Sequence, residues 1–118
     1  MSTTSFSAAM LGALFLSTSA AVGLLPAGPA RAEESHSITI RNHQFVPSTL
    51  TVKAGQKIKL TVTNAQTEAA EFESAELNRE KVVPPGSSAT VYVGPLEPGS
   101  YGFFDDFHPA TKGTIVAK

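Results

Sequence analysis

The segment ITIRNHQFVPSTLTVKAGQKIKLTVTN, residues 38–64, alternates apolar and polar side chains over most of its length. An apolar side chain at every second position lies on one face of a β-strand, because successive side chains of a strand point to opposite faces. Turn-forming residues with proline or glycine separate the alternating runs. The segment therefore predicts short strands with one buried face, carried by Ile38 and Ile40, by Leu50 and Val52, and by Ile58, Leu60 and Val62.

The same alternation continues at Val91 and Val93 and again near Ile115, with turn signals of proline and glycine between the runs. No window has the 3.6-residue apolar stripe of an amphipathic helix. Residues 68–80 are nevertheless rich in helix formers, so we expect one short helical turn there, anchored to the core by Phe72 and Leu77. The pattern predicts an all-β, Greek-key β-sandwich of about seven to eight strands.

The N-terminal part of the chain has a different character. Residues 8–25 form an apolar run of small residues, and Ala30-Arg31-Ala32 follows as a cleavage pattern of the kind that signal peptidase accepts. The alternative is a short membrane anchor, but Ser17, Thr18 and Gly23 interrupt the run. We predict a secretory signal peptide over residues 1–32, a single exported domain over residues 33–118, and no membrane insertion after cleavage.

Composition excludes several classes of function. The 118 residues are 42% hydrophobic and 16% charged with a formal net charge of −1, which is typical of a soluble domain. No basic stripe indicates nucleic-acid binding. Cysteine is absent, so the exported domain has no disulfide and no thiolate chemistry.

Carboxylates and histidine gather at two places in the C-terminal half. The stretch FFDDFHP contains Asp105, Asp106 and His108, and Glu71 and Glu73 flank Phe72. Taken alone, the two aspartates are typical of a turn that ends a strand, and the two glutamates of a solvated strand face. The alternative is a metal site, since carboxylate and imidazole are both metal ligands.

Two ends of the domain resemble the cupredoxins. In the N-terminal half, the residues that match the family pattern are Phe45, Pro47, Val52, Gly55 and Asn64. In the C-terminal half, PGSYGFF at residues 98–104 and GTIV at residues 113–116 are similar to the ligand-loop and final-strand arrangement of that family. The resemblance implies a cupredoxin-like β-sandwich over nearly all of residues 33–118.

The ligand positions depart from those of a blue-copper protein. Asp105 stands where the family has its copper-binding cysteine, His108 keeps the histidine, and residues 109–112 contain no methionine. Glu71 stands near the position of the other histidine. The resemblance thus implies a metal site of Asp105, His108 and Glu71, to which Asp106 and Glu73 are possible additions. We expect His43 to be partly buried or at a strand edge, outside this site, and Phe107 to be an exposed contact.

The exchange of a soft thiolate for hard carboxylates changes the metal that suits the site. Such ligands suit iron in both oxidation states or manganese, and they also bind copper. The motifs EFES, EKVVPPGS, GPLEPG and FFDDFHP are most similar to periplasmic cupredoxin-like proteins of bacterial ferrous-iron uptake systems. This resemblance implies a periplasmic protein that binds iron for a membrane iron permease and other uptake components.

Enzymatic activity stays open at this point. A ferroxidase reaction is compatible with the ligands, but the sequence supplies no obvious electron acceptor, so oxygen, bound copper or a partner protein are alternatives. Two further readings also stay open: a non-redox copper or manganese chaperone, and a β-sandwich interaction module without metal.

Overall fold

The computed structural model describes residues 33–118 and contains nine strands and no helix in that part of the chain. The predicted signal peptide, residues 1–32, lies outside the described residues. Within residues 33–118 there is accordingly no helix long and apolar enough to cross a membrane. The strands are β1 (Glu34–Arg41), β2 (Gln44–Val46), β3 (Thr49–Val52), β4 (Ile58–Asn64), β5 (Ala70–Ser74), β6 (Arg79–Val83), β7 (Ser88–Val93), β8 (Gly99–Asp105) and β9 (His108–Ala117).

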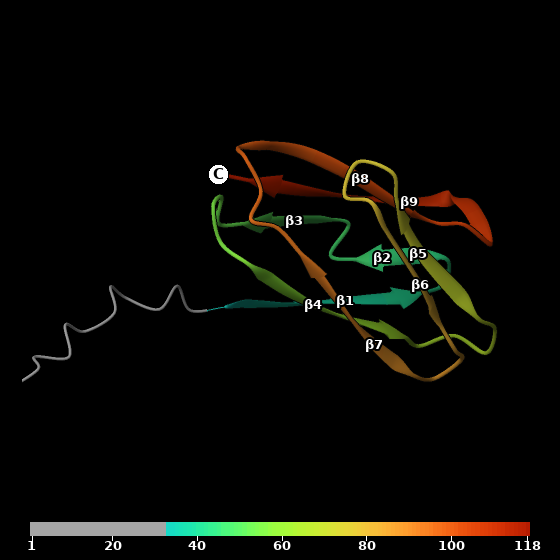
Figure 1. The fold of residues 1–118 in the computed structure, drawn as a ribbon. Coiled ribbons are helices and arrows are strands. Elements are labelled where there is room, and N and C mark those ends of the chain that lie inside the picture. Colours follow the sequence, from blue (N-terminus) through green and yellow to red (C-terminus); the bar gives the residue numbers. More distant parts are fainter. Residues whose placement is uncertain (1–32) are drawn as a thin grey trace, which may run out of the picture.

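The strands form two sheets that pack face to face (Figure 1). One sheet has the order β2-β1-β4-β7 and the other β3-β9-β8-β5-β6. The pairs β1–β4 and β3–β9 are parallel and the remaining pairs are antiparallel. The predicted all-β sandwich is confirmed. It has nine strands, one more than the upper end of the predicted seven to eight.

The expected helical turn within residues 68–80 is wrong. This segment forms β5, a turn and β6, and β5 buries Ala70, Phe72 and Ser74 at every second position. The period-two burial on a sheet outweighs the weak helix propensity of the surrounding glutamates and alanines. Phe72 and Leu77 do lie in the core, as predicted, with 0% and 8% of their surface exposed.

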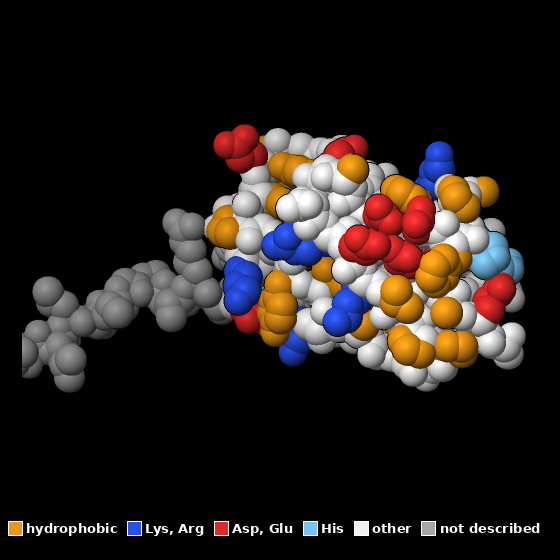
Figure 2. Space-filling model, turned by 45° about the vertical axis from the view of Figure 1, so that its right-hand side comes forward, with side chains coloured by type: hydrophobic (Ala, Val, Ile, Leu, Met, Phe, Trp, Pro, Cys, Tyr) orange, Lys and Arg blue, Asp and Glu red, His pale blue; other side chains and the backbone are white. Residues whose placement is uncertain are grey.

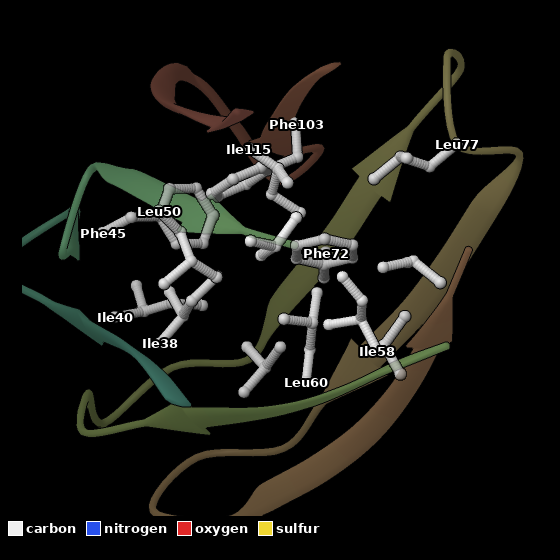
Figure 3. Packing of buried hydrophobic residues seen from close by; sticks show 14 of the residues in the cluster. Ile38, Ile40, Phe45, Leu50, Ile58, Leu60, Phe72, Leu77, Phe103 and Ile115 are labelled. Atoms are coloured by element: carbon white, nitrogen blue, oxygen red, sulfur yellow. The ribbon is translucent and has the colours of Figure 1, made fainter. Parts of the chain in front are cut away.

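The centre of the core is a group of three phenylalanines between the sheets (Figure 3). The ring of Phe103 meets the ring of Phe45 edge-on at 4.8 Å and stacks on Phe72 at 5.1 Å. Gly113 lies directly against this group, because a Cβ built on it would be 2.3 Å from the Phe103 ring. Of the remaining aromatic residues of β8 and its turn, Phe107 is 48% exposed, as expected for a contact residue.

Three chain connections meet at one end of the sandwich, toward the right-hand side of Figure 1. They are the β1–β2 turn, the β4–β5 connection and the β8–β9 turn. Connections between strands tolerate varied sequences, while the sandwich holds their ends in place, so functional side chains are commonly found there. The candidate site is built on this end.

Candidate metal centre

Each of the three connections contributes one metal-ligating side chain to a single group. His43 Nε2 lies 3.2 Å from Glu68 Oε1, and His108 Nε2 lies 3.7 Å from Glu68 Oε2. The two imidazole rings lie 4.4 Å apart between centroids, and one ligand atom from each residue fits within 4.8 Å of the others. We call His43, Glu68 and His108 the histidine cluster.

His43 reaches this group because of a tight hairpin turn. Asn42 and His43 both have positive φ, 50° and 54°, as in the type I′ turns that connect two antiparallel strands. The turn lifts the imidazole off the strand, and 52% of the side chain is exposed. The Thr111 hydroxyl donates a hydrogen bond of 2.7 Å to the His43 carbonyl, which ties the turn to β9. His43 is thus an exposed turn residue, so the expectation of a partly buried or strand-edge position is wrong, and the placement beside His108 is new.

Glu68 is held through a buried asparagine. The amide of Asn64 is fully buried and donates to the carbonyl oxygens of Glu68 at 2.7 Å and Val83 at 3.0 Å. Its Oδ1 atom accepts a hydrogen bond from the Gln66 backbone, and Gln66 Oε1 in turn accepts from the His43 backbone N–H. One buried side chain therefore fixes the backbone that carries Glu68 and, through Gln66, the turn that carries His43.

Asp105 lies behind the imidazole of His108. Its carboxyl is fully buried, and Oδ1 accepts hydrogen bonds from the backbone N–H groups of Glu71 at 2.9 Å and Phe107 at 3.1 Å. Oδ2 faces His108 Nδ1 at 3.5 Å, and neither of these two buried atoms has a hydrogen-bond partner. A histidine that binds metal through one ring nitrogen directs its other N–H to a carboxylate or carbonyl in most metal sites. Asp105 is therefore positioned to orient His108 with Nε2 toward Glu68.

A second group of ligand atoms belongs to Glu71, Glu73 and Asp106, which also lie within 4.8 Å of one another. On β5 the Phe72 side chain enters the core, so its two neighbours point to the opposite face of the sheet. Glu80 is paired with Glu73 across β5 and β6. We call Glu71, Glu73 and Asp106 the acidic cluster; Figure 2 shows acidic side chains gathered in this way among hydrophobic ones.

Mutual repulsion perturbs the acidic cluster. A hydrogen bond with the Glu80 carboxyl, burial, and the neighbouring negative charges raise the pKa of Glu71 from its ordinary 4.5 to about 7. Burial and the charges of Asp106 and Glu80 also raise the pKa of Glu73. The group therefore carries negative charge that either a proton or a cation can offset.

The five residues predicted from sequence thus fall into two groups. Asp105 is opposite Phe72 in the β5–β8 register and lies against His108, whereas Glu71, Glu73 and Asp106 lie close to one another. Glu71 and Glu73 point away from the core-facing Phe72, which separates them from Asp105. Sequence reasoning missed His43 and Glu68. A signal was available for both, since Asn42-His43 is a two-residue turn between alternating segments, and Glu68 follows Asn64 more closely than Glu71 does.

The histidine cluster offers two imidazole nitrogens and carboxylate oxygens, a ligand set that is used for ferrous iron in non-haem enzymes and that also suits copper and zinc. Metal bonds of about 2.0–2.2 Å place neighbouring ligand atoms about 3–3.6 Å apart. The observed 3.2 and 3.7 Å separations are close to that spacing. The three ligand atoms lie within 4.8 Å of one another, so they would have to draw closer together to bind one ion.

Comparisons with known proteins agree with the fold. A family model described as a cupredoxin-like domain matches residues 7–117. An uncharacterized protein of Rickettsia prowazekii (strain Madrid E) is 46% identical over 80 residues, which cover 67% of this chain and 64% of the relative's length.

Solved structures with the same fold include copper proteins. The metal-binding domain of the Streptococcus pneumoniae D39 Cu(I)-exporting ATPase CopA, with Cu(I), has a TM-score of 0.65 at 15% identity, covering 71% of this chain and 84% of that domain. A purple cupredoxin from Nitrosopumilus maritimus has a TM-score of 0.57 at 20% identity, covering 70% and 98%. Amicyanin from Paracoccus versutus has a TM-score of 0.55 at 18% identity, covering 76% and 84%. With the family model matching nearly its whole length, the chain belongs to the cupredoxin-like domain family.

Proposed function

We propose that this protein captures ferrous iron in the periplasm at the histidine cluster and hands it to a membrane iron permease and its associated uptake components. The observation that carries the proposal is the convergence of His43, Glu68 and His108 from three connections, in a chain without cysteine. Export by the predicted signal peptide is part of the proposal.

The ligand set favours iron over a blue-copper centre. A blue-copper site depends on a thiolate, which this chain lacks. Two imidazoles and one carboxylate leave coordination positions of the ion open, as in the ferrous sites of non-haem oxygenases. Asp105, with its orphaned Oδ2 atom beside His108, supplies the outer carboxylate that such a histidine uses.

Exposure of the cluster fits a protein that gives up its ion. The side chains of His43, Glu68 and His108 are 52%, 49% and 36% exposed. A partner that docks on this end of the sandwich can reach the bound ion directly. The half-exposed Phe107 lies in the adjacent β8–β9 turn and provides apolar surface for such a contact.

Oxidation of the iron is a separate extension of this function. Each Fe(II) that becomes Fe(III) releases one electron, which must pass to dioxygen, to a bound copper ion or to a partner protein. Capture and delivery require no acceptor. The proposed function is therefore capture and delivery of Fe(II), and ferroxidase activity is a separate property that is measured after Fe(II) binding.

Copper binding is the second candidate, because histidine nitrogens bind Cu(II) strongly and the neighbours in fold include a metal-binding domain with Cu(I) and a Cu(I) form of amicyanin. Divalent copper binds more tightly than divalent iron at nearly any site of this type. Affinity for Cu(II) in vitro consequently does not decide between the candidates. Added Cu(II) should in any case give no intense thiolate-to-copper absorption, since the chain has no thiol.

Anaerobic calorimetry with Fe(II) tests the proposal. We expect the purified protein to bind Fe(II) and the His43→Ala variant to lose this binding. The matched control is His36→Ala, because His36 lies on β1, pairs with Glu34 at 2.7 Å and is outside the cluster. Equal Fe(II) binding by wild type and His43→Ala would contradict the proposal, and binding of Cu(I) or Cu(II) without any Fe(II) would favour the copper candidate.

Exposure of the loaded protein to air then measures oxidation. A rate of Fe(III) formation above that of buffer, lost in His43→Ala and kept in His36→Ala, would add ferroxidase activity to capture. A rate equal to that of buffer would leave capture alone.

A further inference from the structure

We propose that the acidic cluster is a second cation site, which binds a hard cation of the ferric class independently of the histidine cluster. Its ligands are the carboxylates of Glu71, Glu73 and Asp106, and Glu80 lies beside them. The two clusters share no residue. This inference does not depend on the proposed iron capture, because it concerns a different set of atoms and a different class of metal.

The first observation is a buried atom without a partner. Glu71 is only 6% exposed, and although its carboxyl lies in hydrogen-bonding contact with that of Glu80, no hydrogen-bond donor reaches its buried Oε1 atom. Burial of a carboxylate oxygen without a partner is costly, and in native proteins such an atom indicates an ion or a water that completes the site. The carboxyl of Glu71 offers its ligand atom within 4.8 Å of those of Glu73 and Asp106.

The second observation is uncompensated negative charge. In the described part of the chain, the four recorded ion pairs all involve histidine, and no lysine or arginine pairs with Glu71, Glu73, Glu80 or Asp106. Within residues 33–118 no basic side chain therefore offsets this negative charge by an ion pair.

The third observation is the apolar surroundings of the cluster. Val82 is opposite Glu71 in the β5–β6 register and is 49% exposed, and Phe107 follows Asp106 in the turn and is 48% exposed. In Figure 2 hydrophobic side chains lie beside the acidic group, mainly on its right and below it. Apolar neighbours reduce the screening of charge by water, so the carboxylates attract a cation more strongly than they would on an open surface.

Ligand chemistry defines the class of cation. All donors are carboxylate oxygens, which suit hard, highly charged ions, whereas the histidine cluster has two nitrogen donors. Three carboxylates match the charge of one trivalent ion. The chain would then have two metal sites that prefer different ions. The acidic cluster would bind hard cations through oxygen atoms alone, and the histidine cluster would bind through two nitrogen atoms and carboxylate oxygen.

Terbium(III) tests this inference, because it is a hard trivalent ion that does not change oxidation state and has a luminescence of its own. We expect the full chain to bind Tb(III). The double variant Glu71→Gln/Glu73→Gln should lower its affinity by more than about 10-fold, since the charge of the ligands sets the affinity for hard ions. Glu97→Gln is the matched control, because Glu97 is an exposed glutamate between β7 and β8, outside both clusters.

Two further variants separate this site from the histidine cluster and from a folding defect. Asp106→Asn changes an exposed turn residue, so it should lower Tb(III) affinity without unfolding the domain. His43→Ala should leave Tb(III) affinity within about twofold of wild type while Fe(II) binding is lost. Wild-type Tb(III) affinity in both carboxylate variants, or proton uptake by the cluster with no Tb(III) binding at all, would overturn the inference.

Discussion

The two clusters differ in how the chain holds them. The histidine cluster stands on three connections and depends on buried polar side chains, namely Asn64, Asp105 and Thr111. The acidic cluster stands mainly on the regular strand β5, where alternation alone turns Glu71 and Glu73 to one face. One site is thus built by specific hydrogen bonds and the other by the geometry of a sheet.

The clusters are nevertheless joined by one stretch of backbone. The Glu71 N–H donates to Asp105 Oδ1, and the Glu71 carbonyl accepts a hydrogen bond from the Asp106 N–H. A β-bulge between Phe104 and Asp105 shifts the register there, which is a common means of turning a side chain toward a functional site. Substitutions can therefore disable both clusters, one of them, or only the hydrogen bonds behind one.

A change in the packed core should have the largest effect. In Gly113→Ala the new Cβ would lie 2.3 Å from the buried Phe103 ring and 3.0 Å from the Ser48 carbonyl oxygen. The ring is packed against two other phenylalanines, so we expect the free energy of unfolding to fall by about 2–3 kcal/mol. Urea denaturation checks this. The control is Gly102→Ala, whose Cβ would be 3.6 Å from its nearest atom; equal stability of the two variants would refute the packing account.

Removal of one imidazole should disable the histidine cluster alone. For His108→Ala we expect the affinity for Fe(II) to fall by more than about 100-fold, a larger loss than for an outer-sphere partner. Binding of Tb(III) should stay near that of wild type, because His108 is not in the acidic cluster. Parallel titrations with the two ions measure the difference, and a matching loss of both would show that the clusters act as one site.

A change behind the imidazole should have an intermediate effect. Asp105→Asn keeps the shape of the side chain and an oxygen for the two backbone N–H donors, but removes the carboxylate from His108 Nδ1. Loss of such an outer partner typically lowers metal affinity about 10- to 100-fold. Fe(II) calorimetry should show that loss with an unchanged circular dichroism spectrum. If Asp105 instead binds the ion directly, Asp105→Asn should lose as much affinity as His108→Ala.

The last expected effect is a pH dependence of stability that belongs to the acidic cluster. The pKa of Glu71 is about 7 in the folded chain against an ordinary value of 4.5, so the folded state holds this proton more tightly than the unfolded state. The free energy of unfolding should therefore fall as pH rises from about 4.5 to about 7. In Glu71→Gln this part of the decline should vanish. Urea midpoints in chelator between pH 4.5 and 8 measure it, and identical profiles for variant and wild type would disprove the assignment.

The sequence predicts the regular parts of this molecule better than the connections. Alternation in residues 38–64 indicates which side chains face the core. Around Phe72 the helix formers predict a helical turn instead, and the strand that forms there brings Glu71 and Glu73 to one face. No such rule predicts the contact between His43 and His108, because this contact depends on a two-residue turn and on hydrogen bonds between residues far apart in the chain. The place of Asp105 behind His108 depends on a bulge, which alternation does not predict.

X-ray absorption spectroscopy of the protein loaded with Fe(II) under anaerobic conditions tests the central claim most directly. The histidine cluster predicts two imidazole ligands and oxygen ligands around the iron in wild type. His43→Ala, if loaded at high Fe(II), should retain one imidazole at most. A first shell of oxygen atoms without imidazole in the wild-type protein would contradict the claim and would move the ferrous iron to the acidic cluster.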